Sequence, residues 1–304
     1  MTAGLIGKRI IKTVSSIVDF AVLVIVFLLL AYSGYSLWDS KQIYEAADSS
    51  NYSIYKPTEA NGRKTFQELQ AINPDVFSWI HIYGTNIDYP VVQGRDNLEY
   101  INNNAEGRYS VSGSIFLDVD NSKDYSDFNS VLYGHHMEKK KMFGDIGTFR
   151  DKDVFESRLY GNLYYDGKNH GIELFAFVHT DAYDSLSFTP NVSEANRQNY
   201  LDQLFAKAIN KRDIDVTTKD HILLMSTCSS SSTNGRDILF GRITHEVFKD
   251  PFTDSASING DKISFGTERI VGFFMGIPEI LLILLVIIVP LLLTLILLEK
   301  NRLR

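Results

Sequence analysis

Two long apolar segments, one near each end of the chain, restrict this sequence more than any other feature. The first occupies residues 14–36 and provides about the 20 apolar residues that a helix needs to cross a bilayer. The second covers residues 280–298, which carry no charged side chain and include Pro290, a residue that membrane helices tolerate. Both segments predict transmembrane helices. A signal peptide at the first segment and a buried core helix at either one are the alternatives.

Basic residues flank the two segments and predict their orientation. Lys8, Arg9 and Lys12 precede the first segment, and a basic tail follows the second. By the positive-inside rule, both termini are cytoplasmic and the chain between the segments lies outside. The predicted organisation is a cytoplasmic tail at 1–13, a transmembrane helix at 14–36, a connector with an N-terminal helical region at 37–65, an extracytoplasmic catalytic domain at 66–249, a spacer at 250–275, a transmembrane helix at 276–298 and a cytoplasmic tail at 299–304.

The charge balance and the cysteine count limit what the external part does. The chain has 30 Lys and Arg residues against 37 Asp and Glu residues, a formal net charge of −7. This acidity argues against binding nucleic acid or an anionic membrane surface. Cell-surface domains often carry disulfides, but Cys228 is the only cysteine and can form none within the chain. Cys228 therefore either packs as a small apolar residue or performs chemistry.

Short strand-type segments dominate the external part. They predict strands within 73–93, 113–118, 129–137, 159–167, 171–180, 221–228 and 237–248, with a hairpin turn at 166–171 and a short helix at 65–72. One long helix is predicted over 193–210, with Ser193 as its N-cap and apolar residues at helical spacing. The mixture predicts a mainly β fold, a β-barrel-like core with helical insertions.

Cys228 lies where an apolar strand ends and a serine-rich turn begins. Such a strand end suits an exposed nucleophile, although free cysteine is also among the most buried residue types. Arg236 follows eight residues later, after a turn-type segment and at the start of the next strand. If the two strands form a hairpin, Arg236 returns close to Cys228, where its guanidinium could stabilise a thiolate or an oxyanion. A solvated surface arginine is the alternative, and Arg242 shares the strand face by parity.

Seven histidines compete for the role of proton-transfer group: His81, His135, His136, His170, His179, His221 and His245. Imidazole suits proton transfer near neutral pH. His135 and His136 stand out because the segment "VLYGHHM" leads an apolar strand directly into a Gly-His step. Adjacent residues point to opposite faces of a strand, so at most one of the two faces the site.

Several motifs together resemble the sortase family, class B in particular. These are "YGHHM", "MFGDIGTFRDKDVFE", "LMSTCS" and "NGRDILFGRI", with "INPDVFSWIHIYGTNIDYPVVQ", "DNLEYI" and "GSIFLD" earlier in the chain. The similarity covers about residues 66–245 in the family's order. It implies a sortase-type β-barrel of about eight strands with N-terminal helices and one long inserted helix, here flanked by two predicted transmembrane helices.

The resemblance also implies a role for individual residues. Cys228 of "STC" corresponds to the nucleophile, His135 of "YGH" to the general acid/base and Arg236 of "NGR" to the stabiliser of the transition state. His136 falls at a position that is not catalytic in the family, so a supporting role at most is expected.

Ser226 and Thr227 flank the nucleophile and are expected to shape a substrate groove. The implied reaction is a two-step acyl transfer through a thioester. The implied partners are secreted surface proteins or pilin subunits that carry a C-terminal sorting signal, together with an amine from a peptidoglycan cross-bridge or a pilin lysine. The second apolar segment departs from class B and resembles the topology of the pilin-polymerising class C enzymes, although no "DPW"-like lid motif precedes the domain.

No cofactor is expected. The acidic segment containing Asp118, Asp120 and Asp124 offers hard oxygen ligands, but it lacks the glycine and glutamate of a calcium-binding EF-hand loop, so a solvated turn is predicted. A cysteine hydrolase would use the same Cys–His pair, and a membrane-tethered scaffold would need neither residue. These two functions are the alternatives to a transpeptidase.

Overall fold

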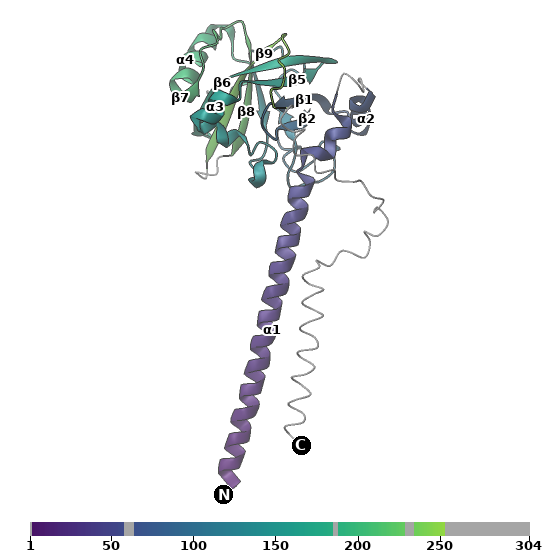
Figure 1. Cartoon of the computed structure of the whole chain (residues 1–304), viewed down its shortest axis with the longest axis vertical. Helices are drawn as coiled ribbons and strands as arrows, with labels where there is room; N and C mark the ends of the chain where they lie inside the picture. The colour runs from purple at the N-terminus through teal and green to yellow at the C-terminus, as the bar shows by residue number, and fades with distance from the viewer. Residues whose placement is uncertain (1, 58–63, 185–187, 229–233, 253–304) are drawn as a thin grey trace. The chain divides into compact units, whose positions relative to one another are not determined.

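The computed structural model describes residues 2–57, 64–184, 188–228 and 234–252 of the chain (Figure 1). The described residues divide into two units, one within Met1–Gln42 and one within Ile43–Gly260. The predicted second transmembrane segment and the tail at 299–304 lie outside the described residues, as does most of the predicted spacer.

The N-terminal apolar segment forms part of one long helix, α1 (Thr2–Ala46). Within the described residues, the helical stretch Ile11–Tyr55 is the one that is long and apolar enough to cross a membrane, with a mean hydropathy of 2.7 in its most apolar part. None of that part is buried within the chain. The helix continues to Ala46, so residues 37–46 of the predicted connector and N-terminal helical region at 37–65 are helical.

Short helices and nine strands form the remainder of the described residues. The helices are η1 (Ser49–Tyr55), α2 (Lys64–Ile72), η2 (Glu138–Lys140), η3 (Ile146–Arg150), α3 (Lys152–Ser157), η4 (Glu194–Asn196) and α4 (Arg197–Lys207). The strands are β1 (Val76–Ile82), β2 (Asp88–Val92), β3 (Ile115–Leu117), β4 (Asn129–Tyr133), β5 (Tyr160–Tyr165), β6 (Lys168–Asp181), β7 (Ala208–Lys211), β8 (His221–Cys228) and β9 (Gly235–Thr244).

Eight of these strands close into a barrel. The sheet order is β5-β1-β2-β3-β4-β8-β9-β6-β7, and β5 also pairs with β6, which closes the ring. The predicted hairpin is confirmed, since β5 and β6 pair from Tyr160↔Glu173 to Tyr165↔Lys168. The prediction of a mainly β barrel of about eight strands is therefore confirmed, and β7 is an additional strand on β6.

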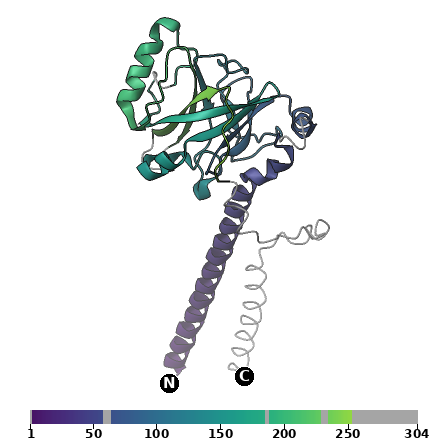
Figure 2. The same cartoon turned by 45° about the horizontal axis from the view of Figure 1, so that its top comes forward.

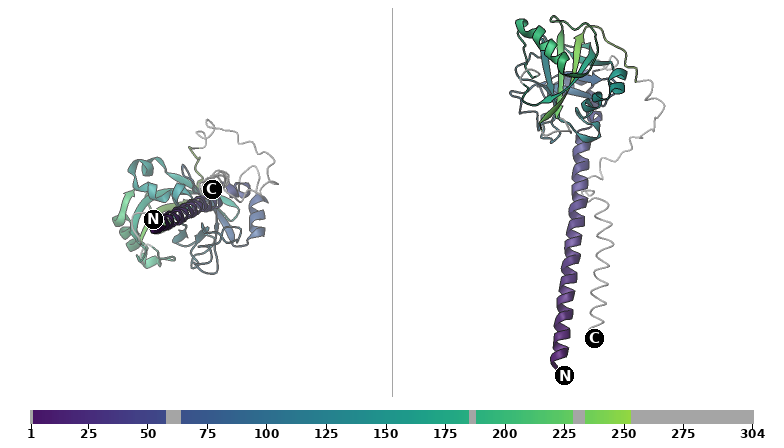
Figure 3. Two further views of the ribbon diagram at one scale, coloured as in Figure 1. Left: turned by 90° about the horizontal axis from the view of Figure 1, so that it is seen from below. Right: turned by 90° about the vertical axis from the view of Figure 1, so that its left-hand side faces the viewer.

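Strand alternation divides the apolar residues between two cores. Leu223 and Met225 of β8 and Leu239 of β9 belong to the core enclosed by the barrel. Their neighbours Leu224 and Ile238 belong to a second core on the outer face, which α4 covers with Leu201 and Leu204. Figures 2 and 3 show α4 outside the strands. Both faces of the sheet are therefore buried at β8 and β9, which explains the continuous apolar runs of these two strands.

The predicted helix over 193–210 is too long at its C-terminal end. α4 ends at Lys207, and Ala208–Lys211 forms β7, which pairs with β6 through Val178↔Ala208, Phe177↔Asn210 and Ala176↔Lys211. Asn210 also donates to the carbonyls of Phe149 and Arg150, each at 2.9 Å. These tertiary contacts override the helical propensity of the segment. Ser193 occupies the N-cap position of η4, which leads directly into α4, but its side chain makes no capping hydrogen bond and its hydroxyl instead accepts from the Asn196 side chain at 3.0 Å.

Candidate active site

The end of β8 and the start of β9 bring Cys228 and Arg236 together. The two strands form an antiparallel hairpin in which Cys228 pairs with Arg236, Thr227 with Asp237 and Ser226 with Ile238. The Cα atoms of directly opposed residues in such a ladder lie about 4.5–5.5 Å apart. The prediction that the hairpin returns Arg236 to Cys228 is therefore confirmed for the backbone.

The strand on the other side of β8 ends two residues before His135. β4 runs parallel to β8 with Tyr133 opposite Ser226, and the Gly134 N–H donates to the Ser226 carbonyl at 3.2 Å. The pairing ends at Tyr133, the last residue of β4, and His135 follows Tyr133 by two residues just as Cys228 follows Ser226. Cys228 and its ladder partner Arg236, together with His135 beyond the end of the neighbouring strand, are called the catalytic row, after the roles that the sequence resemblance implies.

A carbonyl from a distant loop orients the His135 ring. Its Nε2 lies 2.8 Å from the carbonyl oxygen of Ile101, in the connection between β2 and β3. A carbonyl oxygen can only accept, so Nε2 carries the proton and Nδ1 is the basic nitrogen of the neutral ring. Gly113 makes this approach possible. It has φ +59°, and a Cβ added there would lie 2.4 Å from the same Ile101 oxygen.

Steric crowding also explains why a glycine, Gly134, precedes His135. A Cβ on Gly134 would lie 2.5 Å from Ile115 Cδ1 and 2.7 Å from a ring carbon of Phe143, both of which belong to the barrel core. The Gly-His step therefore lets the chain leave β4 over a filled core, and the sequence signal "YGH" has a packing basis.

Arg236 is the half-buried cation of the row. Its Nη1 donates to the carbonyl of Gly235 at 3.1 Å, and within the described residues no carboxylate forms an ion pair with it. Arg242, the alternative by parity, pairs with Glu173 at 2.5 Å and lies opposite Ile222. That position is about 20 Å further along β9 at roughly 3.4 Å per residue, so Arg242 lies far from Cys228.

Ser226 and Thr227 of β8 are buried within the barrel rather than exposed on its surface. Both are 2% exposed, and the Thr227 hydroxyl has no hydrogen-bond partner among the described residues. Their assignment to the substrate groove stays a prediction, and burial means that any effect on the groove is exerted through the backbone they hold.

Behind the row lies a buried carboxylate that sequence reasoning missed. Asp237 is 4% exposed and accepts from His179 Nδ1 at 2.8 Å and from Arg150 Nη2 at 3.2 Å. Asp237 follows Arg236 directly, so its contacts with His179 and Arg150 hold the start of β9 in place. The adjacent "RD" pair in the sequence was the available signal, but nothing in it pointed to His179 or Arg150.

The other histidines do not join the row. His136 forms an isolated bridge with Met142, and its buried Nδ1 has no hydrogen-bond partner within the part of the chain that the structure describes. Of the predicted solvated acidic turn, Asp118 is in fact buried, since it accepts from Tyr133 and from Asn97 at 2.9 Å each. Among the described residues, no group of three His, Cys, Asp or Glu side chains could hold a metal ion.

Comparison with known proteins identifies the family, although no family model matches the chain. The structure is similar to sortase B from the type II pilus of Streptococcus pneumoniae, with 43% identity and a TM-score of 0.53 over 60% of this chain and 99% of that one. It is also similar to a class B sortase involved in pilus biogenesis in Streptococcus pyogenes, with 40% identity and a TM-score of 0.55 over 59% and 97% of the two chains.

A third relative is sortase B of Staphylococcus aureus. It is 29% identical over 204 residues, which make up 66% of this chain and 83% of the relative. The identity to the streptococcal structures extends over almost their whole length, and the eight-stranded barrel is the fold that the sequence motifs implied. The chain belongs to the class B sortases and is a cysteine transpeptidase.

Proposed function

We propose that the catalytic row performs the acyl transfer, with Cys228 as nucleophile, His135 as general acid/base and Arg236 as oxyanion stabiliser. The pairing of Cys228 with Arg236, together with the parallel pairing of β4 with β8 that ends two residues before His135 and Cys228, is the observation that supports the assignment most directly. A nucleophile, a proton carrier and a fixed cation are the groups that attack on an amide carbonyl requires.

The chemistry follows in two steps. His135 takes the proton of the Cys228 thiol as the sulfur attacks a backbone carbonyl carbon of the sorting signal, and the guanidinium of Arg236 stabilises the negative oxygen that results. The carbon–nitrogen bond then breaks as protonated His135 gives its proton to the leaving amine, which leaves a thioester on Cys228. An acceptor amine attacks the thioester, His135 takes its proton, and the sulfur leaves.

The hydrogen bond to Ile101 assigns the two ring nitrogens of His135 different tasks. Nε2–H is held by the carbonyl oxygen at 2.8 Å, so proton transfer falls to Nδ1. The fixed tautomer spares the ring a reorientation during the reaction.

The long apolar helix supports membrane anchoring. In this proposal residues 14–36 span the bilayer, the chain up to 13 is cytoplasmic, and residues 66–249 act outside the cell. Residues 276–298 span the membrane a second time between a spacer at 250–275 and a cytoplasmic tail at 299–304. Both the substrate and the acceptor of a sortase would then meet the enzyme at the outer membrane face.

The proposed substrates are secreted proteins with a C-terminal sorting signal, and pilin subunits are favoured over other surface proteins. The reason is that the two streptococcal relatives, at 43% and 40% identity, come from pilus systems. The acceptor would then be a pilin lysine, with a peptidoglycan cross-bridge amine as the competing choice.

The test uses the full chain in detergent and intact-mass measurement. The enzyme is incubated with peptides from the C-terminal regions of secreted proteins, with a glycine-chain amine, with a pilin domain, or with neither. A peptide adduct on Cys228 that an amine converts to ligated product supports the proposal. Release of free acid despite the amine would instead show a hydrolase.

Two variants test the residue roles in the same assay. Cys228→Ala is expected to abolish both adduct and product, and His135→Ala to abolish product. Retention of activity in Cys228→Ala would show that the thiol is not the nucleophile, because the chain has no other cysteine.

A further inference from the structure

The segment that follows His135 has a strained backbone. Lys139, Lys140 and Met142 have φ values of +56°, +57° and +52°, the left-handed region that non-glycine residues rarely adopt. We call residues 136–143 the histidine loop. Such conformations persist only where the surroundings hold them in place.

The histidine loop folds back onto the residue that precedes it. The Phe143 N–H donates to the His135 carbonyl at 3.1 Å, and His136 and Met142 form a bridge. Any relaxation of the strained residues would therefore move the backbone of His135.

One buried tyrosine connects the histidine loop to the end of α1. Tyr89 of β2 is 2% exposed, and its hydroxyl accepts from the Met142 N–H at 3.0 Å and donates to the Ala47 carbonyl at 2.9 Å. Burial raises the pKa of this hydroxyl, so it remains a neutral group able to make both bonds. Its partner Met142 is one of the three left-handed residues.

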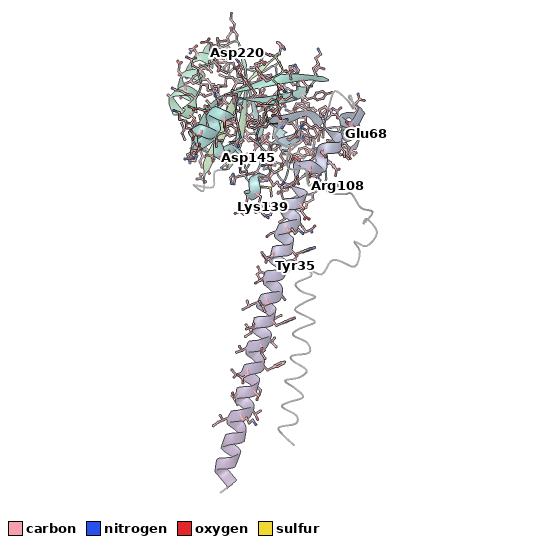
Figure 4. The ribbon with its side chains drawn as sticks, viewed as in Figure 1. Tyr35, Glu68, Arg108, Lys139, Asp145 and Asp220 are labelled. Atoms are coloured by element: carbon pink, nitrogen blue, oxygen red, sulfur yellow. The ribbon has the colours of Figure 1, made fainter. Side chains whose placement is uncertain are left out.

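Side chains just outside the barrel hold the same loop. Lys141 forms an ion pair with Asp48, and the Tyr44 hydroxyl donates to Glu138 at 3.2 Å. Lys139, labelled in Figure 4, places its ammonium 4.5 Å from the centroid of the Tyr44 ring. Partial burial pushes the pKa of the Asp48 carboxyl up, but hydrogen bonds from Lys141 and Ser50 outweigh it and hold that pKa below its usual value.

We propose that Tyr89 is a positioning residue for His135: its hydroxyl fastens the strained histidine loop to the end of α1 and so keeps the imidazole beside Cys228. This inference rests on the proposed role of His135. The tyrosine hydroxyl takes no part in the chemistry and acts only through the loop backbone.

The test measures how the alkylation rate of Cys228 by iodoacetamide depends on pH in the full chain. Only the thiolate reacts, so the profile reports the charge of groups beside the sulfur. His135→Ala defines the profile without the imidazole. Tyr89→Phe removes one hydroxyl, and Tyr125→Phe is the matched control, because Tyr125 is 1% exposed and its hydroxyl bonds Ser78 at 2.7 Å.

The expected result is that Tyr89→Phe moves the profile toward that of His135→Ala, with about a threefold or larger change in rate at pH 7, while Tyr125→Phe follows the wild type. A Tyr89→Phe profile equal to the wild type, with His135→Ala displaced, would overturn the inference and leave the proposed function standing. Equal displacement by both tyrosine variants would also overturn it, because the effect would then be general loosening.

The same alkylation measurement also covers two further cases. If His135→Ala and the wild type coincide, His135 does not act on Cys228, and both the proposed role and the inference fail. If Tyr89→Phe does not fold, Asp48→Asn replaces it, since asparagine can keep the cap to the Ser50 N–H at 2.9 Å but loses the charge facing Lys141. A smaller shift in the same direction is expected, and no shift would contradict the inference.

Discussion

The two sides of Cys228 are built in different ways. On one side Arg236 is its ladder partner in a continuous hairpin, so strand register alone places the two backbones together. On the other side His135 lies two residues beyond β4, where a remote carbonyl and the histidine loop hold it. A strand ladder tolerates sequence change, whereas the histidine depends on a few specific contacts. Damage to the histidine side should therefore have effects that differ in kind from damage to the arginine side.

After Cys228→Ala and His135→Ala, which are expected to abolish product, the largest effect is expected at the arginine. Arg236→Lys keeps the charge but loses the forked guanidinium, so the rate of transpeptidation should fall about a hundredfold with little change in stability. Arg242→Lys is the control, since that residue pairs with Glu173 away from the row. Product formation by mass spectrometry measures both. A near-normal rate for Arg236→Lys would move the oxyanion role to backbone donors.

The next effect concerns the support of His135. Gly113→Ala introduces a Cβ that would meet the Ile101 carbonyl at 2.4 Å and a backbone with φ +59° that alanine adopts poorly. We expect a loss of about 3 kcal/mol in the free energy of unfolding and a tenfold or greater loss of rate in the fraction that folds.

Gly107→Ala is the matched control for that variant. Its φ is +78°, but the nearest atoms to an added Cβ are on Asn73 at 3.9 Å, so it carries the backbone cost without the clash. Chemical denaturation and rate measurement of both variants separate the two causes. Equal loss of rate in both would show that Ile101 does not orient His135.

A smaller effect is expected at the neighbouring histidine. His136→Ala should keep at least about a tenth of the activity, because its ring lies off the catalytic row and proton transfer needs a group beside the sulfur. Equal loss in His136→Ala and His135→Ala would show that the distinction between them is wrong.

The smallest effect concerns stability away from the row. Burial lowers the pKa of His81, and the nearby charges of Asp88, Lys56 and Asp250 modify this shift. Burial also lowers the pKa of His170. Below about pH 6.5 the unfolded chain then binds more protons than the folded one, so stability falls as the pH falls.

Thermal unfolding measured from about pH 7.5 to pH 5 should therefore show a falling midpoint temperature. His81→Gln should flatten part of this slope without changing the rate at pH 7.5, since β1 does not contribute to the catalytic row. A slope unchanged in His81→Gln would exclude this histidine as its source.

The contrast between the strand ladder at Arg236 and the specific contacts that hold His135 also explains how much could be predicted from the sequence. Alternating apolar residues and turn residues predicted most strands and the hairpin that joins Cys228 to Arg236, because these features are local. The Ile101 carbonyl could not be predicted, since a backbone group leaves no mark on residue type. The hydroxyl of Tyr89 likewise acquires its role only from tertiary neighbours that are distant in sequence.

The error in helix prediction at 208–211 has the same origin. The residues of this segment are compatible with a helix, but pairing with β6 makes it a strand. Propensity and patterning describe the chain alone, whereas packing partners decide where an element ends.

The parallel pairing of β4 with β8 has a consequence for the time course of folding. His135 and Cys228 are separated by about 90 residues of chain, so they come together only after a slow, long-range strand pairing has formed. A partly folded molecule would therefore present a thiol with no proton carrier beside it. Such a chain can acquire its reactivity only once β4 and β8 have paired.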